Sequence, residues 1–271
     1  VIASRSVGPF APKELVPQFK WSDRYPDFDR IMKNTRYHVL WMHDTFCDGD
    51  QYIEDFLLRG YIHKVFTLSD FHTIYFSTCD HSRKRMFEVD KRFIFQTRNG
   101  INPVYNRWVD VRDKDPDLFV YNSSLTKGMM PLVDMIWPRV KKNIPTAKLK
   151  IVGGFYRFRP DHGPDEQEKK FYELKAYGES LNIDIEFTGI IKQDKIAELL
   201  AKASYMIYPS AFPETYGIST LEALASNVPI LTCRFGALEE TAIDIASYKM
   251  DYSIEPNGLY PWINKDYQVN A

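Results

Sequence analysis

The chain has 271 residues, of which 44% are apolar and 15% aromatic, which suits one large or two small globular domains and excludes a disordered or fibrous protein. Its 35 Lys and Arg residues nearly balance its 36 Asp and Glu residues, so no overall charge directs the chain to nucleic acid or to an anionic membrane. The sequence has no signal-peptide pattern and no apolar run near the roughly 20 residues that span a bilayer, so we expect a soluble protein.

The N-terminal half alternates short apolar strands with amphipathic helices. "YHVLWMHD" (37–44) and "HKVFTLS" (63–69) have the composition of buried strands, and residues 49–60 repeat apolar side chains at helical spacing. Further strands are predicted at 1–7 and 92–100, and a further helix at 70–79. This alternation predicts an α/β layer around a parallel sheet.

The second half repeats the alternation more clearly. Five strands are predicted, at 117–124, 147–154, 183–191, 204–210 and 228–234. Helices are predicted at 128–144, 165–181, 192–203 and 217–227. This order predicts a Rossmann-like domain, in which ligands bind in the loops after the carboxyl ends of the strands.

These loops carry small and polar residues that suit a phosphorylated ligand. Three of the five place a glycine near a cationic or hydroxyl side chain, and helix N-termini supply unpaired N–H groups for phosphate. Neither G-x-x-x-x-G-K-[ST] nor G-x-G-x-x-G is present. A nucleotide would therefore be held without either of these motifs.

The stretch "PETYGISTLEALASNVPIL" (213–231) holds Glu214 and Glu222 at an E-x7-E spacing. It resembles the corresponding region of the GT-B glycosyltransferases, specifically the large retaining family four (glycosyl transferases group 1). Four further segments resemble that family in the same order: 97–102, 120–154, 187–191 and 235–240. The resemblance covers most of residues 92–244.

The resemblance implies an α/β fold of GT-B type, with two Rossmann-like domains that face a cleft. Residues 1–110 would be a partial acceptor-side domain, and residues 111–271 a donor-binding domain. The N-terminal domain is expected to be incomplete, because no segment resembles the first strand and glycine-rich loop of the family.

The resemblance also assigns the contacts to the donor. Glu222 would accept the ribose hydroxyls, since a carboxylate accepts two O–H donors at once. Gly217 and the N–H groups of Ile218 and Ser219 would face the diphosphate. A helix-start acid and a plain turn glycine remain the structural alternatives for Glu222 and Gly217.

Lys127 and Gly128 match the phosphate-loop Lys-Gly of the family, where the ammonium stabilises the departing diphosphate. Many members carry an arginine about five residues earlier, where this chain has Asn122, and Ser123 and Ser124 are the alternative phosphate donors. A solvated surface lysine remains the alternative for Lys127. The other residues assigned to the donor are Thr215, Tyr216, Gly153, Gly154, Gly189, Ile190 and Ile191.

Three residues are expected to take part in the reaction. Glu214 would reach the hydroxyls of the transferred sugar, Lys127 would stabilise the leaving group, and His43 would orient or deprotonate an acceptor hydroxyl. The alternatives are a solvated loop acid for Glu214 and a satisfied loop histidine for His43.

No cofactor or metal is expected. Three adjacent residues at 79–81 (Cys-Asp-His) cannot all face one ion, and Cys47, Cys79 and Cys233 lack metal-ligand spacing. Three unpaired cysteines favour reduced thiols in a cytoplasmic protein.

The function implied is transfer of a hexose, with retention, from a nucleotide-diphosphate sugar to a hydroxyl acceptor. The acceptor would be a glycan, a lipid-linked molecule or a protein, with no nucleic acid partner and with peripheral membrane contact left open. Two alternatives remain: a non-catalytic nucleotide-sugar-binding or scaffolding module, and a nucleotide-sugar epimerase of GT-B type.

Overall fold

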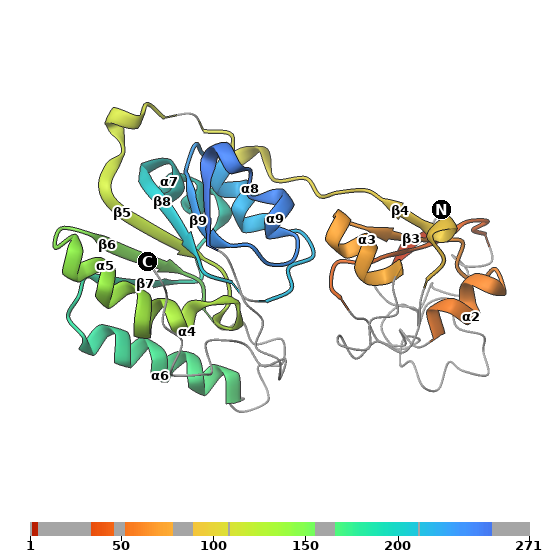
Figure 1. The fold of residues 1–271 in the computed structure, drawn as a ribbon, viewed down its shortest axis with the longest axis horizontal. Coiled ribbons are helices and arrows are strands. Elements are labelled where there is room, and N and C mark those ends of the chain that lie inside the picture. Colours follow the sequence, from red (N-terminus) through yellow and green to blue (C-terminus); the bar gives the residue numbers. More distant parts are fainter. Residues whose placement is uncertain are drawn as a thin grey trace. The chain divides into compact units, whose positions relative to one another are not determined.

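The computed structural model describes residues 2–4, 34–45, 52–77, 89–107, 109–154, 166–210 and 212–250. Its contacts divide the chain into a first unit, Val1–Asn99 with Pro213–Tyr216, and a second unit, Gly100–Phe212 with Gly217–Ala271. Each unit contains its own parallel sheet (Figure 1). Cys47 and residues 79–81, for which the sequence predicts no metal site, lie outside the described residues.

The first unit has a four-stranded sheet. Its strands, in spatial order, are β1 (Ile2–Ser4), β2 (His38–Trp41), β3 (Lys64–Thr67) and β4 (Ile94–Gln96). Helix α2 (Ile53–Leu58) buries Ile53, Phe56 and Leu57 on one face, as its helical spacing predicts. Helix α3 (Asp70–Ser77) begins after Ser69, whose hydroxyl accepts the backbone N–H of His72.

The second unit has a six-stranded parallel sheet in the order β10-β9-β8-β5-β6-β7. The strands are β5 (Asp115–Asn122), β6 (Lys148–Val152), β7 (Ile185–Gly189), β8 (Ala203–Tyr208), β9 (Ile230–Cys233) and β10 (Ser247–Met250). Apart from short 3-10 turns, its helices are α4 (Met129–Pro131), α5 (Trp137–Asn143), α6 (Glu166–Ser180), α7 (Gln193–Lys202), α8 (Ile218–Ala225) and α9 (Leu238–Thr241). Helices α4, α5 and α6 cover one side of the sheet, and α7 and α8 cover the other (Figure 1). This is the doubly wound Rossmann order, with its reversal between β5 and β8.

Two local predictions for the second unit are wrong. The sequence predicts five strands, whereas β10 is a sixth, at the edge of the sheet. Its four residues, Ser-Tyr-Lys-Met, contain no apolar run, so the pattern gives no strand signal. The single helix predicted at 128–144 is interrupted by a π-helical turn at Leu132–Ile136, because Pro138 has no N–H to donate to the carbonyl of Asp134.

The segment before β5 belongs to the second unit rather than to the first. Tyr105, in a 3-10 turn at Pro103–Tyr105, is buried in the core, and its carbonyl accepts the hydroxyl of Ser226 at 3.1 Å. The side chain of Asn102 donates to Gln193 at the start of α7, at 2.9 Å. The predicted boundary at 110/111 therefore differs from the contact division at 99/100 by the residues that pack on α7 and α8.

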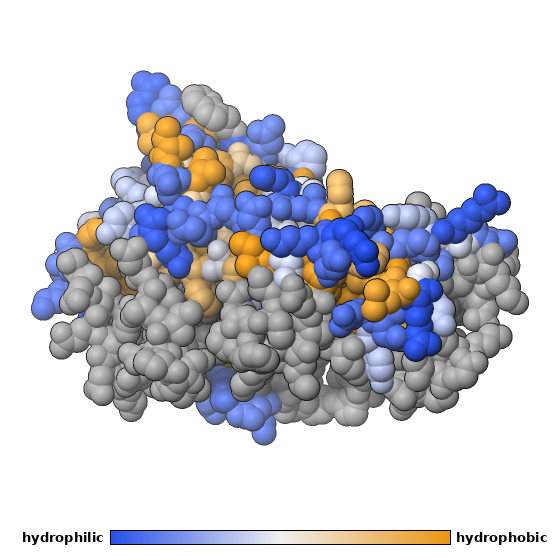
Figure 2. Space-filling view, turned by 45° about the vertical axis from the view of Figure 1, so that its right-hand side comes forward, coloured by the Kyte–Doolittle hydropathy of each residue, from blue (hydrophilic) through white to orange (hydrophobic). Residues whose placement is uncertain are grey.

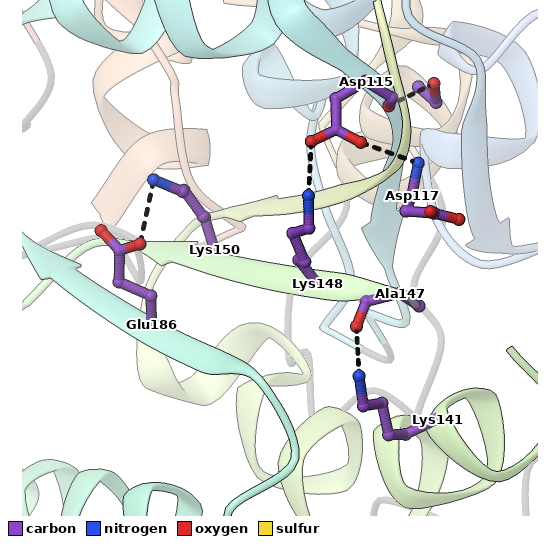
Figure 3. A network of polar contacts seen from close by, with 8 residues as sticks. Asp115, Asp117, Lys141, Ala147, Lys148, Lys150 and Glu186 are labelled. Atoms are coloured by element: carbon purple, nitrogen blue, oxygen red, sulfur yellow. Dashed lines mark hydrogen bonds and ion pairs between the residues drawn. The ribbon is translucent and has the colours of Figure 1, made fainter. Parts of the chain in front are cut away.

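Ion pairs follow the strands β5, β6 and β7 (Figure 3). Lys148 pairs with Asp115 at 3.0 Å, and Lys150 pairs with Glu186 at 2.9 Å. Because these side chains are at least partly exposed, each pair contributes only about 0–1 kcal/mol to stability. They favour the observed register without determining it.

The outer surface gives no sign of a membrane-spanning helix in the described part of the chain. No helix there is both long enough and apolar enough to cross a bilayer. Figure 2 shows apolar residues, in orange, as several separate patches among hydrophilic ones on the face that it presents.

Lys114 joins two helix ends to the start of β5. Its side chain is only 7% exposed, and its ammonium donates to the carbonyls of Ala201 and Ala203, both at 3.1 Å, and of Ser226 at 3.4 Å. These carbonyls lie at the C-terminal ends of α7 and α8, where a cation also favours the helix dipoles. Burial lowers the pKa of Lys114, and all three ammonium protons have an acceptor.

Replacing this ammonium will destabilise the second unit. In Lys114→Met the stem remains but three buried carbonyls lose their donor, so we expect a loss of about 2–4 kcal/mol in the free energy of unfolding. Urea denaturation followed by circular dichroism measures it. Lys148→Met is the matched control, since its exposed ion pair should cost under about 1 kcal/mol. Equal losses in the two variants would contradict this role for Lys114.

Candidate functional site

The predicted donor residues of the second unit gather where the sheet reverses its strand order. The reversal lies between β5 and β8, which are neighbours in the sheet but are not consecutive in the chain. The loops after these strands begin at Ser123 and Pro209 and lead to α4 and α8 on opposite faces of the sheet (Figure 1), and such a switch point is where ligands bind in doubly wound sheets. We refer to these loops as the switch-point loops.

Two glycines allow the loops at this edge to approach one another. Gly128 has φ +99°, and a Cβ there would lie 2.3 Å from the carbonyl oxygen of Pro209 in the loop after β8. Gly153, after β6, has φ +136°, and a Cβ there would lie 2.7 Å from the carbonyl oxygen of Ser123. Because no other residue fits either position without displacing backbone, both glycines are structural requirements of this edge.

Lys127 ends a 3-10 turn at Leu125–Lys127 in the first of the switch-point loops. Its ammonium lies 4.8 Å from the centre of the Phe212 ring in the second, a cation–π contact across the switch point. The hydroxyls of Ser123 and Tyr208 lie 3.4 Å apart across the same point. These contacts keep a positive charge and two hydroxyls at the carboxyl ends of β5 and β8.

Gly217 begins α8 in the left-handed conformation, with φ +72°. A Cβ there would lie 2.8 Å from a methyl group of Leu238, so a side chain is excluded by space as well as by backbone conformation. The amides of Ile218 and Ser219 follow in the first turn, where N–H groups have no intrahelical acceptor. This end of α8 can therefore donate to an anion.

Glu222 is a buried acid on α8. Its side chain is 9% exposed, and the side-chain amide of Asn122 donates to its Oε2 at 3.1 Å. Burial raises the pKa of Glu222, and its interactions with Tyr105 and Asn122 offset part of the rise. The pKa of Tyr105 is raised by burial and by the negative charge of Glu222.

Asn122 and Tyr105 are neighbours of Glu222 that the sequence does not predict. Asn122, noted as a departure from the family pattern, lies at the end of β5 and contacts Glu222, 100 residues away in the chain. Tyr105 and Phe212 carry no sequence signal for a site, since each reads as one more aromatic residue in an apolar context. Only the fold brings them to Glu222 and Lys127.

Most of the other predicted donor residues form a second group, at the ends of β6 and β7. Gly153 and Gly189 form a backbone bridge, and a Cβ on Gly154 would lie 3.1 Å from the side chain of Ile190. Ile190 is exposed, whereas Ile191 packs against the core. Ser124 is exposed in the loop that the sequence predicts to bind phosphate, with its hydroxyl 3.3 Å from that of Thr126.

The remaining predicted residues belong to the first unit. Glu214, Thr215 and Tyr216 are buried, and the hydroxyl of Thr215 donates to the carbonyl of His43 at 2.5 Å. His43 follows β2, and its ring lies 5.3 Å from that of Trp41. His72 also contacts the loop that follows β2. Its Nε2 lies 3.2 Å from the carbonyl oxygen of Asp44, and its Nδ1 accepts the N–H of Leu68.

The described residues contain no group of three His, Cys, Asp or Glu side chains that could hold a metal ion. The polar groups at the switch point are instead one cation, helix and loop amides, hydroxyls and one buried carboxylate. This set can bind a phosphate at one end and donate or accept hydrogen bonds to hydroxyl groups at the other.

Comparison with known proteins identifies a family for this arrangement. Residues 107–251, more than half of the chain, match the family described as glycosyl transferases group 1. No curated protein matches the chain in a sequence search.

Solved glycosyltransferase structures share the fold. HepE from Anabaena in complex with UDP is 16% identical, with a TM-score of 0.58 over 80% of this chain and 58% of HepE. TarM from S. aureus, in a complex that contains UDP, is 17% identical, with a TM-score of 0.57 over 83% of this chain and 43% of TarM. WaaG, involved in lipopolysaccharide biosynthesis, is 16% identical, with a TM-score of 0.57 over 85% of this chain and 69% of WaaG. These likenesses confirm the predicted α/β GT-B fold class, while the chain spans only 58% of the length of HepE.

A side chain at Gly128 will disrupt the switch-point loops. In Gly128→Ala the new methyl would meet the Pro209 carbonyl and the backbone would keep a strained positive φ, so we expect a loss of about 2 kcal/mol or more in unfolding free energy. Gly100→Ala is the control, because a Cβ there meets nothing within 4 Å. Urea unfolding of both variants measures the difference, and a neutral Gly128→Ala would contradict the close approach.

Glu222 should make stability depend on pH in a defined direction. Its folded pKa lies above the ordinary value of 4.5, so its stabilising contribution is complete below 4.5 and is lost as the pH rises through the raised value. Glu222→Gln cannot ionise, and we expect its stability relative to the wild type to increase between pH 4.5 and pH 8. Urea titrations across that range test this, with the exposed Glu173→Gln as control. A difference independent of pH would show that burial does not disfavour the charged form of Glu222.

Proposed function

Because the chain belongs to the glycosyl transferases of group 1, we propose that it transfers a hexose from a nucleotide-diphosphate sugar to a hydroxyl acceptor, with the donor bound by the second unit. The observation that carries this proposal is the contact of Asn122, at the end of β5, with Glu222 on α8. It supports the proposal because it brings a buried carboxylate to the same switch point as the loop predicted to bind phosphate.

The diphosphate would lie between the switch-point loops. Lys127 supplies the positive charge, the amides at the start of α8 supply hydrogen-bond donors, and Ser123, Ser124 and Gly128 complete the loop. Charge develops on the diphosphate as the sugar leaves, and donors already fixed in place stabilise it without reorganisation. The ring of Phe212 contacts the ammonium of Lys127 at this position.

The nucleoside would lie along the carboxyl ends of β5, β6 and β7. Glu222 accepts the ribose hydroxyls, and the backbone around Gly153, Gly154 and Gly189, with Ile190 and Ile191, contacts the base. UDP is the first candidate nucleotide, because HepE and TarM were both solved with UDP. UDP-glucose, present in another HepE structure, is the first candidate donor.

The transferred sugar and the acceptor are assigned to the first unit and its loop 213–216. Glu214 contacts sugar hydroxyls, supported by Thr215 and Tyr216, and His43 orients or deprotonates the acceptor hydroxyl. By its family, the reaction proceeds with retention and needs no metal or cofactor. The acceptor is a glycan, a lipid-linked molecule or a protein in the cytoplasm.

An epimerase of the same fold is disfavoured. Such an enzyme needs acid and base side chains beside the donor, and the described part of the second unit contains no histidine. A non-catalytic nucleotide-sugar-binding module would have the same donor site as the enzyme. Only a measurement of turnover distinguishes the two.

A ligand panel tests the donor site. We expect UDP and UDP-sugars to raise the melting temperature, because a ligand at about 100 times its Kd adds about 2.7 kcal/mol to the stability of the folded state. Lys127→Met should weaken UDP binding by about tenfold or more and leave uridine binding unchanged, because only UDP carries the charge that Lys127 meets. Lys195→Met, at an exposed ion pair on α7, is the charge-matched control.

Turnover is measured in the same preparation as UDP released from UDP-glucose with and without acceptor sugars. Binding without release would favour the non-catalytic module. Absence of a thermal shift with every nucleoside diphosphate would overturn the proposed donor site.

A further inference from the structure

Lys127 is the one cationic residue of the two switch-point loops. Residues 123–128 and 209–217 contain a single lysine and no arginine or histidine. Asn122, just before the first loop, is neutral where the family pattern has an arginine. The positive charge that these loops can offer to an anion therefore depends on where one flexible side chain places its ammonium.

The backbone of Lys127 is anchored to the core of the second unit. Its N–H donates to the carbonyl of Ser124 at 3.1 Å, and the same carbonyl accepts the hydroxyl of Tyr121 at 2.7 Å. Tyr121 lies on β5 and is fully buried. Gly128, the next residue, lies against the carbonyl of Pro209 in the other loop. The position of the ammonium then depends on the four-carbon stem of the lysine.

Phe212 contacts the far end of this stem. Its ring centre lies 4.8 Å from the ammonium nitrogen, within the distance of about 6 Å at which an aromatic face attracts a cation. The N–H of Phe212 donates to the hydroxyl of Ser210 at 3.2 Å, and Ser210 is fully buried. The ring therefore extends from an anchored turn after β8 toward the loop after β5.

The contact with Phe212 orders the cation and keeps its charge available. A carboxylate in this place would neutralise the ammonium, whereas a ring attracts it without neutralising it. The ammonium has three N–H donors, so a ring on one side leaves donors for an oxyanion on another. A side chain that is already ordered loses less rotamer entropy when it binds, which favours affinity.

Phe212 is not a core residue of the second unit. Its side chain is only partly buried, and it is not among the residues that form or line the hydrophobic core in the described part of the chain. Its replacement by another apolar side chain should therefore leave the fold intact, so that an effect on binding can be measured.

We propose that Phe212 is a positioning residue that holds the ammonium of Lys127 at the switch point, where it meets the diphosphate of the donor. This rests on the proposed donor site. Phe212 acts through Lys127 and makes no contact with the donor itself. By ordering the one cation of these loops, the ring compensates in part for the arginine that this chain lacks.

The test compares UDP with uridine by isothermal titration calorimetry. Phe212→Leu removes the ring and keeps an apolar side chain, so UDP binding should weaken about three- to tenfold while uridine binding stays unchanged. Phe212→Tyr keeps an aromatic face and should bind UDP as the wild type does. Phe95→Leu is the matched control, because it removes an exposed ring from β4 of the first unit and should change neither affinity.

A double-mutant cycle separates positioning from direct contact. If Phe212 acts through the ammonium, Phe212→Leu should have no further effect on UDP affinity in the Lys127→Met background. A ring that stacks on the nucleotide would instead add its own loss in that background. If Phe212→Leu does not fold, Phe212→Met replaces it, because this change also removes the ring and keeps an apolar side chain.

The outcomes are distinct from those of the donor-site test. The role of Phe212 is overturned, and the donor site stands, if Phe212→Leu binds UDP as the wild type does, if it weakens UDP and uridine equally, or if Phe212→Tyr is as weak as Phe212→Leu. A further loss in the Lys127→Met background overturns it as well. A wild type that binds no UDP overturns the donor site, and this inference with it.

Discussion

The close approach of Gly128 to the carbonyl of Pro209 is the constraint on which the candidate site depends. It joins the loops after β5 and β8, which the doubly wound order brings together at one edge but sends to opposite faces. The contact between Lys127 and Phe212 spans this junction and would lengthen if a side chain separated the loops. Asn122, at the end of β5, meets Glu222 on the helix that follows the second loop. The absence of a side chain at Gly128 thus allows the two loops to approach closely enough for the contacts of Lys127 and Glu222.

Lys114 and Glu222, two of the buried charged groups of the second unit, differ in how they are compensated. Lys114 has an acceptor for each proton and lies at two helix C-termini, where its charge is favoured twice, so its role is to hold the fold. Glu222 accepts a hydrogen bond from the neutral side-chain amide of Asn122, and burial raises its pKa. An incompletely satisfied buried acid is costly unless something else binds it, which is the condition expected of a ligand site.

Local patterns in the sequence predict the elements well and the contacts of the site poorly. Strands such as β6 and helices such as α7 follow from periodicity. The sequence alone treats Asn122 as the loss of a positive charge, because its partner Glu222 lies 100 residues away. The sequence likewise gives no signal for Tyr105, because its position beside α8 comes from the packing of the 3-10 turn and not from a motif. Element signals are local, whereas site contacts depend on topology.

Glu214 and Glu222, the two acids of the E-x7-E spacing, lie in different units of the fold. The contact division passes between Tyr216 and Gly217, so Glu214 belongs to the first unit and Glu222 to the second. Gly217 lies at this division, where its left-handed backbone leads the chain into α8 and Leu238 leaves no room for a side chain. Their sequence spacing therefore joins two acids that belong to different compact units. The spacing reflects the length of chain that leads from one compact unit into the next, with one acid in each unit.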